Sequence, residues 1–274
     1  MGADAPRVGI RTLGCKVNRS EAEALAESLT ALGVALVADE SDADAIVVNT
    51  CAVTGEAGSK GRKEVRRALR ATSGPVVVTG CLAAIEAECL RGLGERVHVR
   101  TDHSCLAQEI AALLEAAAAE QPPSGGRVRT VSASIRADAP FRNRTRALVK
   151  VQDGCSNRCS YCIVPDARGV PRSVPTVEVL EHMRARQADG AAEVVLTGVN
   201  IGRYCDPEGA CDLAGLVELI AATGIPRIRV SSIEPPDLDD RMLEVLARTP
   251  SVANHLHVPL QSGCDRTLAA MGRR

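Results

Sequence analysis

The stretch Ala147-Leu-Val-Lys-Val-Gln-Asp-Gly-Cys155-Ser-Asn-Arg-Cys159-Ser-Tyr161-Cys162 joins a short apolar run to three closely spaced cysteines. Residues 147–152 predict a β-strand, so the cysteines lie on the loop that leaves it. Three thiolates spaced four and three residues apart on one loop can bind three corners of a cubane [4Fe–4S] cluster and leave the fourth iron open. Zinc would need a fourth protein ligand, and the sequence offers none nearby.

Strands and helices alternate after this loop. Further strands are predicted at residues 193–197, 227–232 and 255–260, and the helices between them include 176–189 and 212–223. Four βα units in succession predict part of a (βα) barrel. Four strands cannot close a barrel, and the sequence stops within a predicted helix, residues 265–274. We therefore expect a chain truncated at its C-terminus; the alternative is an open sheet that a partner completes.

The residues before this partial barrel predict a second kind of α/β unit. Short β-branched runs suit parallel strands that are buried on both faces. They are found at residues 8–13, 34–37, 46–48, 76–78 and 97–99. The first predicted helix is capped by Ser20, with Glu23 completing a capping box, and it ends at Gly33. A basic helix at 60–69 and an apolar-faced helix at 105–119 follow.

This alternation predicts the domain organisation. Residues 1–119 are expected to form a doubly wound parallel-sheet domain, and residues 144–274 to form the partial barrel. Residues 120–143 contain a Pro/Gly/Ser-rich segment and then basic residues, so we expect a basic linker there.

Composition excludes several classes of protein. The 274 residues carry a net charge of −1 and are 45% apolar, which argues against a disordered chain or a nucleic-acid polycation. With no Trp, one Phe and two Tyr, the chain cannot bind single-stranded nucleic acid mainly by aromatic stacking. The sequence shows neither a signal peptide nor an apolar membrane span, so we expect a cytoplasmic protein. In that compartment thiols stay reduced, and 11 cysteines indicate metal or cluster ligands first.

A second set of three cysteines lies in the N-terminal domain. Cys15, Cys51 and Cys81 each follow a predicted strand. Because the carboxyl ends of parallel strands meet at one edge of a sheet, we expect the three thiols to converge there. Three thiols would suit a second cluster with one open iron; ordinary buried cysteines are the alternative.

Both cysteine sets resemble those of a known family. Tyr161, an aromatic residue directly before the third cysteine, completes a pattern that resembles the radical S-adenosylmethionine (SAM) enzymes. The stretches around Cys15 (TLGCKVN), Cys51 (VNTCAVT) and Cys81 (VTGC) resemble the N-terminal domain of the methylthiotransferases. The resemblance covers the whole chain. It implies two [4Fe–4S] clusters, an auxiliary one on Cys15, Cys51 and Cys81 and a SAM-binding one on Cys155, Cys159 and Cys162.

Several stretches are most similar to the branch that acts on threonylcarbamoyladenosine in tRNA. These are KVN after Cys15, AVT after Cys51, and the segments LTGVNIG (196–202), RVSSIEP (229–235) and HVPLQSG (257–263). The branches that act on isopentenyladenosine in tRNA and on a ribosomal protein remain alternatives. Asp166 and Ala84 depart from the family pattern, which also includes two further βα units and a C-terminal RNA-binding barrel.

The resemblance implies a radical mechanism. Carbon 2 of adenine has an unactivated C–H bond that no side-chain base removes, so no residue is assigned as a catalytic acid or base. The SAM-bound cluster would produce a 5′-deoxyadenosyl radical, and the auxiliary cluster would carry the sulfur for the methylthio group. Tyr161 is expected to pack against the adenine of SAM. Further contacts with SAM are expected at the carboxyl ends of barrel strands, from Thr197, Gly198, Glu234 and Gln261.

Such an enzyme would need several partners. It would need tRNA, a sulfur donor and a reductant such as flavodoxin or ferredoxin, and no membrane. Two basic stretches, residues 60–70 and 127–150, are expected to contact RNA phosphates; a solvated helix face is the alternative for the first. From other classes, an iron–sulfur electron carrier and a zinc-dependent RNA-binding module remain possible. The carrier would need neither an open iron nor Tyr161.

Overall fold

A computed structural model describes residues 5–120, 145–209 and 211–273. The chain divides into two compact units, residues 1–142 and 143–274. The predicted linker, 120–143, falls outside the described residues except for Glu120, which ends a helix. Within the described residues, no helix combines the length and the apolar character needed to cross a membrane.

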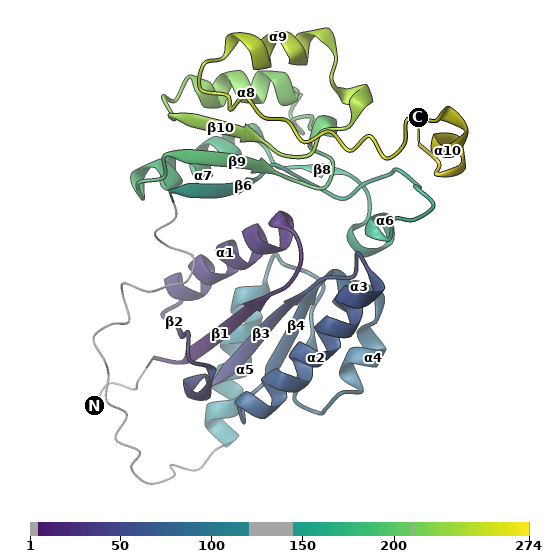
Figure 1. The fold of residues 1–274 in the computed structure, drawn as a ribbon. Helices are drawn as coiled ribbons and strands as arrows, with labels where there is room; N and C mark the ends of the chain where they lie inside the picture. Colours follow the sequence, from purple (N-terminus) through teal and green to yellow (C-terminus); the bar gives the residue numbers. More distant parts are fainter. Residues whose placement is uncertain (1–4, 121–144, 210, 274) are drawn as a thin grey trace. The chain divides into compact units, whose positions relative to one another are not determined.

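The first unit is built on a five-stranded parallel sheet (Figure 1). Its strands run in the order β2-β1-β3-β4-β5. They are β1 (Arg7–Thr12), β2 (Ala35–Leu36), β3 (Ala45–Thr50), β4 (Val76–Gly80) and β5 (Val97–Val99). Its longer helices are α1 (Lys16–Ala31), α2 (Gly55–Ala71) and α5 (Leu106–Glu120), and the shorter ones are α3 (Cys81–Ile85) and α4 (Ala87–Arg91).

Helices cover both faces of this sheet. On one face, the buried Ile46 and Val48 of β3 pack with side chains of α2, α3 and α4. On the other face, Val47 of the same strand packs with α1 and α5. The central strand β3 is therefore buried along its whole length, as its apolar run requires. This arrangement confirms the predicted doubly wound parallel sheet.

The predicted start of the first helix is wrong. Helix α1 begins at Lys16, and its N-cap is Cys15, with extended backbone and no side-chain cap. Ser20 and Glu23 lie inside the helix and are buried. Gly14, at φ 101°, turns the chain sharply after β1, so the helix can start directly behind Cys15 without the predicted capping box.

The second unit contains a three-stranded parallel sheet in the order β10-β9-β6. Its strands are β6 (Arg146–Lys150), β9 (Glu193–Thr197) and β10 (Arg227–Val230). A small antiparallel pair, β7 (Gln152–Asp153) and β8 (Arg172–Ser173), lies outside this sheet. The helices are α6 (Val164–Arg168), α7 (Thr176–Ala188), α8 (Leu213–Ala221), α9 (Asp240–Arg248) and α10 (Asp265–Ala270).

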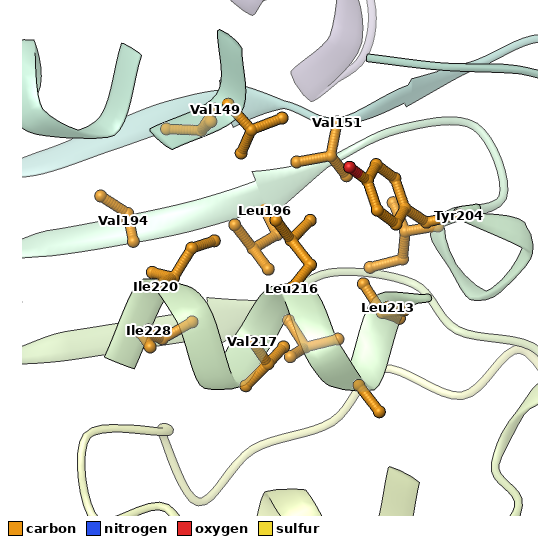
Figure 2. Packing of buried hydrophobic residues seen from close by; sticks show 14 of the residues in the cluster. Val149, Val151, Val194, Leu196, Tyr204, Leu213, Leu216, Val217, Ile220 and Ile228 are labelled. Carbon is orange, nitrogen blue, oxygen red and sulfur yellow. The ribbon is translucent and has the colours of Figure 1, made fainter. Parts of the chain in front are cut away.

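One apolar core joins the strands of the second unit to helices α7, α8 and α9. Figure 2 shows Val149, Val194 and Leu196 from the strands packed against Leu216 and Ile220 of α8. Alternation of strands with covering helices confirms a partial (βα) unit.

The predicted fourth strand at residues 255–260 is wrong. This segment forms only one isolated parallel bridge, between Ser232 and His257, and is not a strand of the sheet. The amide of His255 bonds locally to the carbonyl of Ala253, and Pro259 has no amide to donate. A regular ladder with β10 therefore cannot continue through these residues.

Candidate functional sites

The loop of residues 155–162 leaves the short strand β7 and brings three cysteines together. The amide of Cys155 donates to the carbonyl of Gly169 (3.0 Å), and that of Cys162 donates to the carbonyl of Cys159 (3.0 Å). The amide of Asn157 donates to the Cys155 sulfur at 3.4 Å. Cys159 is buried, while Cys155 and Cys162 are half-buried. Backbone hydrogen bonds thus hold the loop with its thiols close to one another.

Electrostatics indicate what these thiols require. Burial raises the pKa of Cys155, and the neighbouring Glu234, Cys162 and Cys159 raise it further, against the lowering effect of the Asn157 amide. Three nearby thiols cannot all be thiolates without a compensating positive charge. Bound metal would supply that charge and deprotonate the thiols, so the donor set fits an iron–sulfur cluster.

Gln152 connects this loop to the end of β9, and sequence analysis missed it. The side chain is fully buried, and its Nε2 donates to the carbonyls of Asp153 and Gly154, both at 2.7 Å. Its Oε1 accepts from the amides of Val199 (3.1 Å) and Asn200 (2.8 Å). A polar residue ending an apolar strand, just before a functional loop, was the available signal.

Two of the predicted SAM contacts have structural roles in the described fold. The hydroxyl of Thr197 donates to the carbonyl of Val195 at 3.2 Å within the same strand. At Gly198, a Cβ would lie 2.8 Å from the carbonyl oxygen of Gln152, so only glycine fits there. Their contacts with SAM stay a prediction.

The other predicted contacts lie in loops: Tyr161 in the cysteine loop itself, and Glu234 and Gln261 in two later loops. Glu234 follows β10 and accepts from Asn157 Nδ2 at 3.3 Å. Tyr161 is 51% exposed. Gln261 has a φ of 62°, and it alone among the described non-glycine residues has a positive φ. Strained backbone of this kind persists where the surroundings impose it and is often found at binding sites.

Each cysteine of the first set lies at the carboxyl edge of the N-terminal sheet. Cys15 caps α1 after β1, Cys51 directly follows β3, and Cys81 is the first residue of α3 after β4. Register explains the convergence, because Thr12 pairs with Asn49 in β3 and Thr50 pairs with Gly80 in β4. The three strand ends are therefore level with one another.

Two glycines allow the close approach of these segments. A Cβ on Gly14 would lie 2.7 Å from the Cβ and 2.9 Å from the sulfur of Cys51. A Cβ on Gly80 would lie 2.3 Å from Asn49 Oδ1 and 2.4 Å from the Thr50 carbonyl oxygen. Both glycines have positive φ, 101° and 87°. These two glycines form a cradle around Cys51, because a side chain at either position would collide with Cys51 or with the two residues before it.

A buried pair of asparagines ties the Cys15 segment to the Cys51 segment. Asn18 Nδ2 donates to Asn49 Oδ1 (3.1 Å) and to the Thr50 carbonyl (2.7 Å), and Asn49 Nδ2 donates to the Asn18 carbonyl (2.8 Å). The thiol of Cys15 in turn reaches Asn18 Oδ1 at 3.4 Å. These asparagines position two of the cysteines, a role that sequence analysis did not assign.

Within the described part of the chain, no three His, Cys, Asp or Glu side chains are placed to hold one metal ion together. Both cysteine sets are included in this finding. Their assignment as ligands of two [4Fe–4S] clusters stays a prediction.

The basic stretch 60–70 forms most of helix α2. Exposed cations follow the outer side of the helix: Lys60, Lys63, Arg66, Arg67 and Arg70. Of these, Arg67 forms an ion pair with Glu64 at 3.9 Å. The less exposed Arg62 forms one with Glu86 at 2.7 Å. The second basic stretch, 127–150, falls mostly outside the described residues.

Comparison with known proteins assigns both units. Residues 7–100 match the family described as "Uncharacterized protein family UPF0004", and residues 149–274 match the radical SAM superfamily. A relative from Bacillus subtilis (strain 168), threonylcarbamoyladenosine tRNA methylthiotransferase MtaB, is 36% identical over 97% of this chain and 60% of its own length. A relative from Chlorobium phaeobacteroides (strain BS1), tRNA-2-methylthio-N(6)-dimethylallyladenosine synthase, is 31% identical over 97% of this chain. The chain spans about three fifths of the length of these relatives.

Solved structures show a similar fold. The radical SAM methyltransferase TsrM from Kitasatospora setae, solved with cobalamin and a [4Fe–4S] cluster, superposes with a TM-score of 0.65 at 15% identity. The match covers 98% of this chain and 63% of TsrM. At this identity the similarity shows the fold alone.

Proposed function

The chain belongs to the radical-SAM methylthiotransferase family, and from that premise we propose that the protein adds a methylthio group to C2 of N6-threonylcarbamoyladenosine next to the anticodon of tRNA. One observation carries the proposal: the chain contains two separate sets of three cysteines, each gathered where strands of its unit end. The transfer needs both a radical and a sulfur carrier, and two three-cysteine sites suit these two tasks.

The loop of residues 155–162 would bind one [4Fe–4S] cluster and SAM. When bound, they supply a carbon radical strong enough to activate the C–H bond of adenine. The loop contributes three thiols and leaves one iron open. Tyr161 presents an exposed ring beside them, which suits packing against the adenine of SAM. Glu234, Gln261, Thr197 and Gly198 are the proposed further contacts.

Cys15, Cys51 and Cys81 would bind the second cluster. The cradle around Cys51 and the asparagine pair fix the Cys15 and Cys51 segments against each other, which supports this assignment. Sulfur would come from an external donor, and electrons from a reductant such as flavodoxin or ferredoxin.

For the tRNA substrate, we propose that the exposed cations of α2 contact phosphates. They present five positive charges along one helix, and phosphate contacts of this kind fix orientation rather than sequence.

Isopentenyladenosine-type substrates are the second candidate. Relatives named as dimethylallyladenosine synthases match this chain at 31–33% identity, close to the 33–36% of the threonylcarbamoyladenosine relatives. The sequence segments around Cys15 and Cys51 favour the first substrate.

Mass spectrometry of tRNA nucleosides tests the proposal. We expect cells that lack the full-length gene to lose 2-methylthio-N6-threonylcarbamoyladenosine and to accumulate its precursor without the methylthio group. A gene copy with Cys155, Cys159 and Cys162 replaced by Ala is the matched control and should not restore the modification. Loss of the methylthio form of isopentenyladenosine instead would support the second candidate. An unchanged nucleoside profile would reject both.

A further inference from the structure

Arg273 reaches from the segment after α10 into the cysteine loop. Its side chain is only 9% exposed. Nη1 lies 3.9 Å from the sulfur of Cys159, 3.3 Å from the hydroxyl of Tyr161 and 3.2 Å from Oε1 of Glu234. Nη2 donates to the carbonyl of Pro259 at 3.3 Å. A single guanidinium therefore joins the cysteine loop to the loops that carry Glu234 and Gln261.

The backbone around Arg273 is itself anchored on the cysteine loop. The amide of Ser160 donates to the carbonyl of Met271 at 3.0 Å. Gly272 has a φ of 67°, and a Cβ there would lie 3.0 Å from the carbonyl oxygen of Arg158. Glycine thus lets the chain turn directly against this loop, and that contact sets where the Arg273 side chain begins.

Two opposite charges, the guanidinium of Arg273 and the carboxylate of Glu234, lie next to the cysteine loop. Arg273 brings one positive charge to the sulfur of Cys159, and the same Nη1 pairs with the carboxylate of Glu234. Glu234 is held in turn by Asn157 Nδ2 at 3.3 Å. Its side chain is 23% exposed, against 9% for Arg273, so water screens the carboxylate more than the guanidinium. Water therefore weakens the field of Arg273 at Cys159 less than the field of Glu234, which acts on the neighbouring Cys155.

We propose that Arg273 is a positioning residue that holds a positive charge and an N–H donor against the Cys159 sulfur and so makes the cluster bound there easier to reduce. This inference rests on the proposed function, because it needs a cluster on Cys155, Cys159 and Cys162. Net charge and hydrogen bonds to the sulfurs are among the quantities that set the reduction potential of such clusters. The same guanidinium fixes the Tyr161 hydroxyl and thereby the ring expected to meet SAM.

Replacing Arg273 and replacing Glu234 should shift the midpoint potential of the cluster in opposite directions, and this difference tests the proposal. Removing the positive charge should make the midpoint potential more negative, whereas removing the negative charge should make it less negative. A purely structural role would move both potentials in one direction or leave them unchanged. Arg273→Lys keeps the charge but loses the planar fork, so it separates charge from hydrogen-bond geometry.

The experiment is a redox titration, followed by electron paramagnetic resonance, with dithionite as the reductant. Cys15, Cys51 and Cys81 are replaced by Ala in every sample, so that only one cluster is measured, and iron and sulfide are assayed first. We expect Arg273→Gln to shift the potential downwards, Glu234→Gln to shift it upwards and Arg273→Lys to stay near the parent. If Arg273→Gln loses its cluster while Arg273→Lys keeps it, the charge requirement is also supported.

Two outcomes would overturn the inference. One is an unchanged potential in Arg273→Gln, and the other is an equal shift or an equal loss of cluster in the Gln and Lys variants. If the parent protein itself binds no four-iron cluster, the proposed function fails instead. The iron and sulfide assay therefore distinguishes the two failures.

Discussion

The two sets of cysteines are each brought toward one place, by different routes. In the second unit, Cys155, Cys159 and Cys162 share one loop of eight residues, so local backbone hydrogen bonds bring them together. In the first unit, Cys15, Cys51 and Cys81 come from three strand ends, and only the pairing of β1, β3 and β4 makes them neighbours. A site within one loop keeps its cysteines close together even when strands elsewhere in the fold shift slightly. A site built from three strands depends on sheet register and on the glycines that let the segments approach.

Replacing each set of three cysteines in turn should separate the two sites most clearly and have the largest effect on iron content and SAM cleavage. Reconstituted full-length protein should hold about eight irons in two clusters. Replacing Cys155, Cys159 and Cys162 by Ala should remove about half of the iron and all cleavage of SAM to 5′-deoxyadenosine. Replacing Cys15, Cys51 and Cys81 should also remove about half of the iron but spare that cleavage.

Iron, sulfide and product analysis check this prediction. Full iron content in the first triple variant would contradict the assignment of ligands. Loss of SAM cleavage in a folded second variant would show that the two roles are assigned wrongly.

Gly14→Ala should disturb the three-strand site without reaching the loop site. The positive φ costs about 1–2 kcal/mol for a residue with a Cβ. The contact with Cys51, with a Cβ at 2.7 Å, adds about 1–3 kcal/mol of overpacking. Gly33→Ala is the matched control, because its φ is 81° and no atom lies within 4 Å of a Cβ there.

Chemical unfolding and iron content measure both variants. Gly33→Ala should lose about 1–2 kcal/mol of unfolding free energy and no iron. Equal losses in the two variants would mean that the cradle around Cys51 plays no part in the site.

Gln152→Met tests the connection within the second unit. Methionine has a similar length but cannot pair with the amides of Val199 and Asn200, and a buried amide without a partner costs about 1–3 kcal/mol. Gln187→Met, on helix α7, is the control and should change stability by less than about 0.5 kcal/mol. Hydrogen exchange should show faster exchange at 198–201 in Gln152→Met alone. Protection equal to that of the parent protein would contradict the connection.

Asp153 should give the smallest effect, confined to acid pH. Burial raises its pKa, but attraction by Lys150 and Arg168 outweighs this, so the pKa lies below its usual value. The carboxylate therefore adds stability above its unfolded pKa of about 3.9, and that stability is lost as pH falls through the lower folded value. Asp153→Asn should cost about 1 kcal/mol at neutral pH, the difference between charged and neutral hydrogen bonds.

The measurement is unfolding free energy against pH. As pH falls below about 4, the difference between the parent protein and Asp153→Asn should begin to shrink, and it should vanish only below the lowered folded pKa, where the carboxyl is neutral in the folded state as well. A constant difference between the two proteins down to pH 2 would show that the ion pairs with Lys150 and Arg168 do not matter.

Local patterns in the sequence were enough to predict the buried parallel strands of the first unit and the position of both cysteine sets in the fold. The β-branched runs at β3, β4 and β5 predicted buried parallel strands, because strands covered on both faces carry few polar side chains. The spacing of Cys155, Cys159 and Cys162 predicted their proximity, because a loop of eight residues cannot hold its thiols far apart. The cysteines after three separate strands predicted a common edge from the topology of parallel sheets alone.

Tertiary structure decided what depends on residues distant in the sequence. Asn18 and Asn49 pair across 31 residues, and Arg273 reaches Cys159 across 114. No local pattern marks such partners. Helix α1 starts at Lys16 because the turn at Gly14 packs against Cys51, and that contact overrides the capping box at Ser20. Residues 255–260 have the composition of a strand but remain outside the sheet, because a strand exists only where a neighbour supplies hydrogen bonds in register.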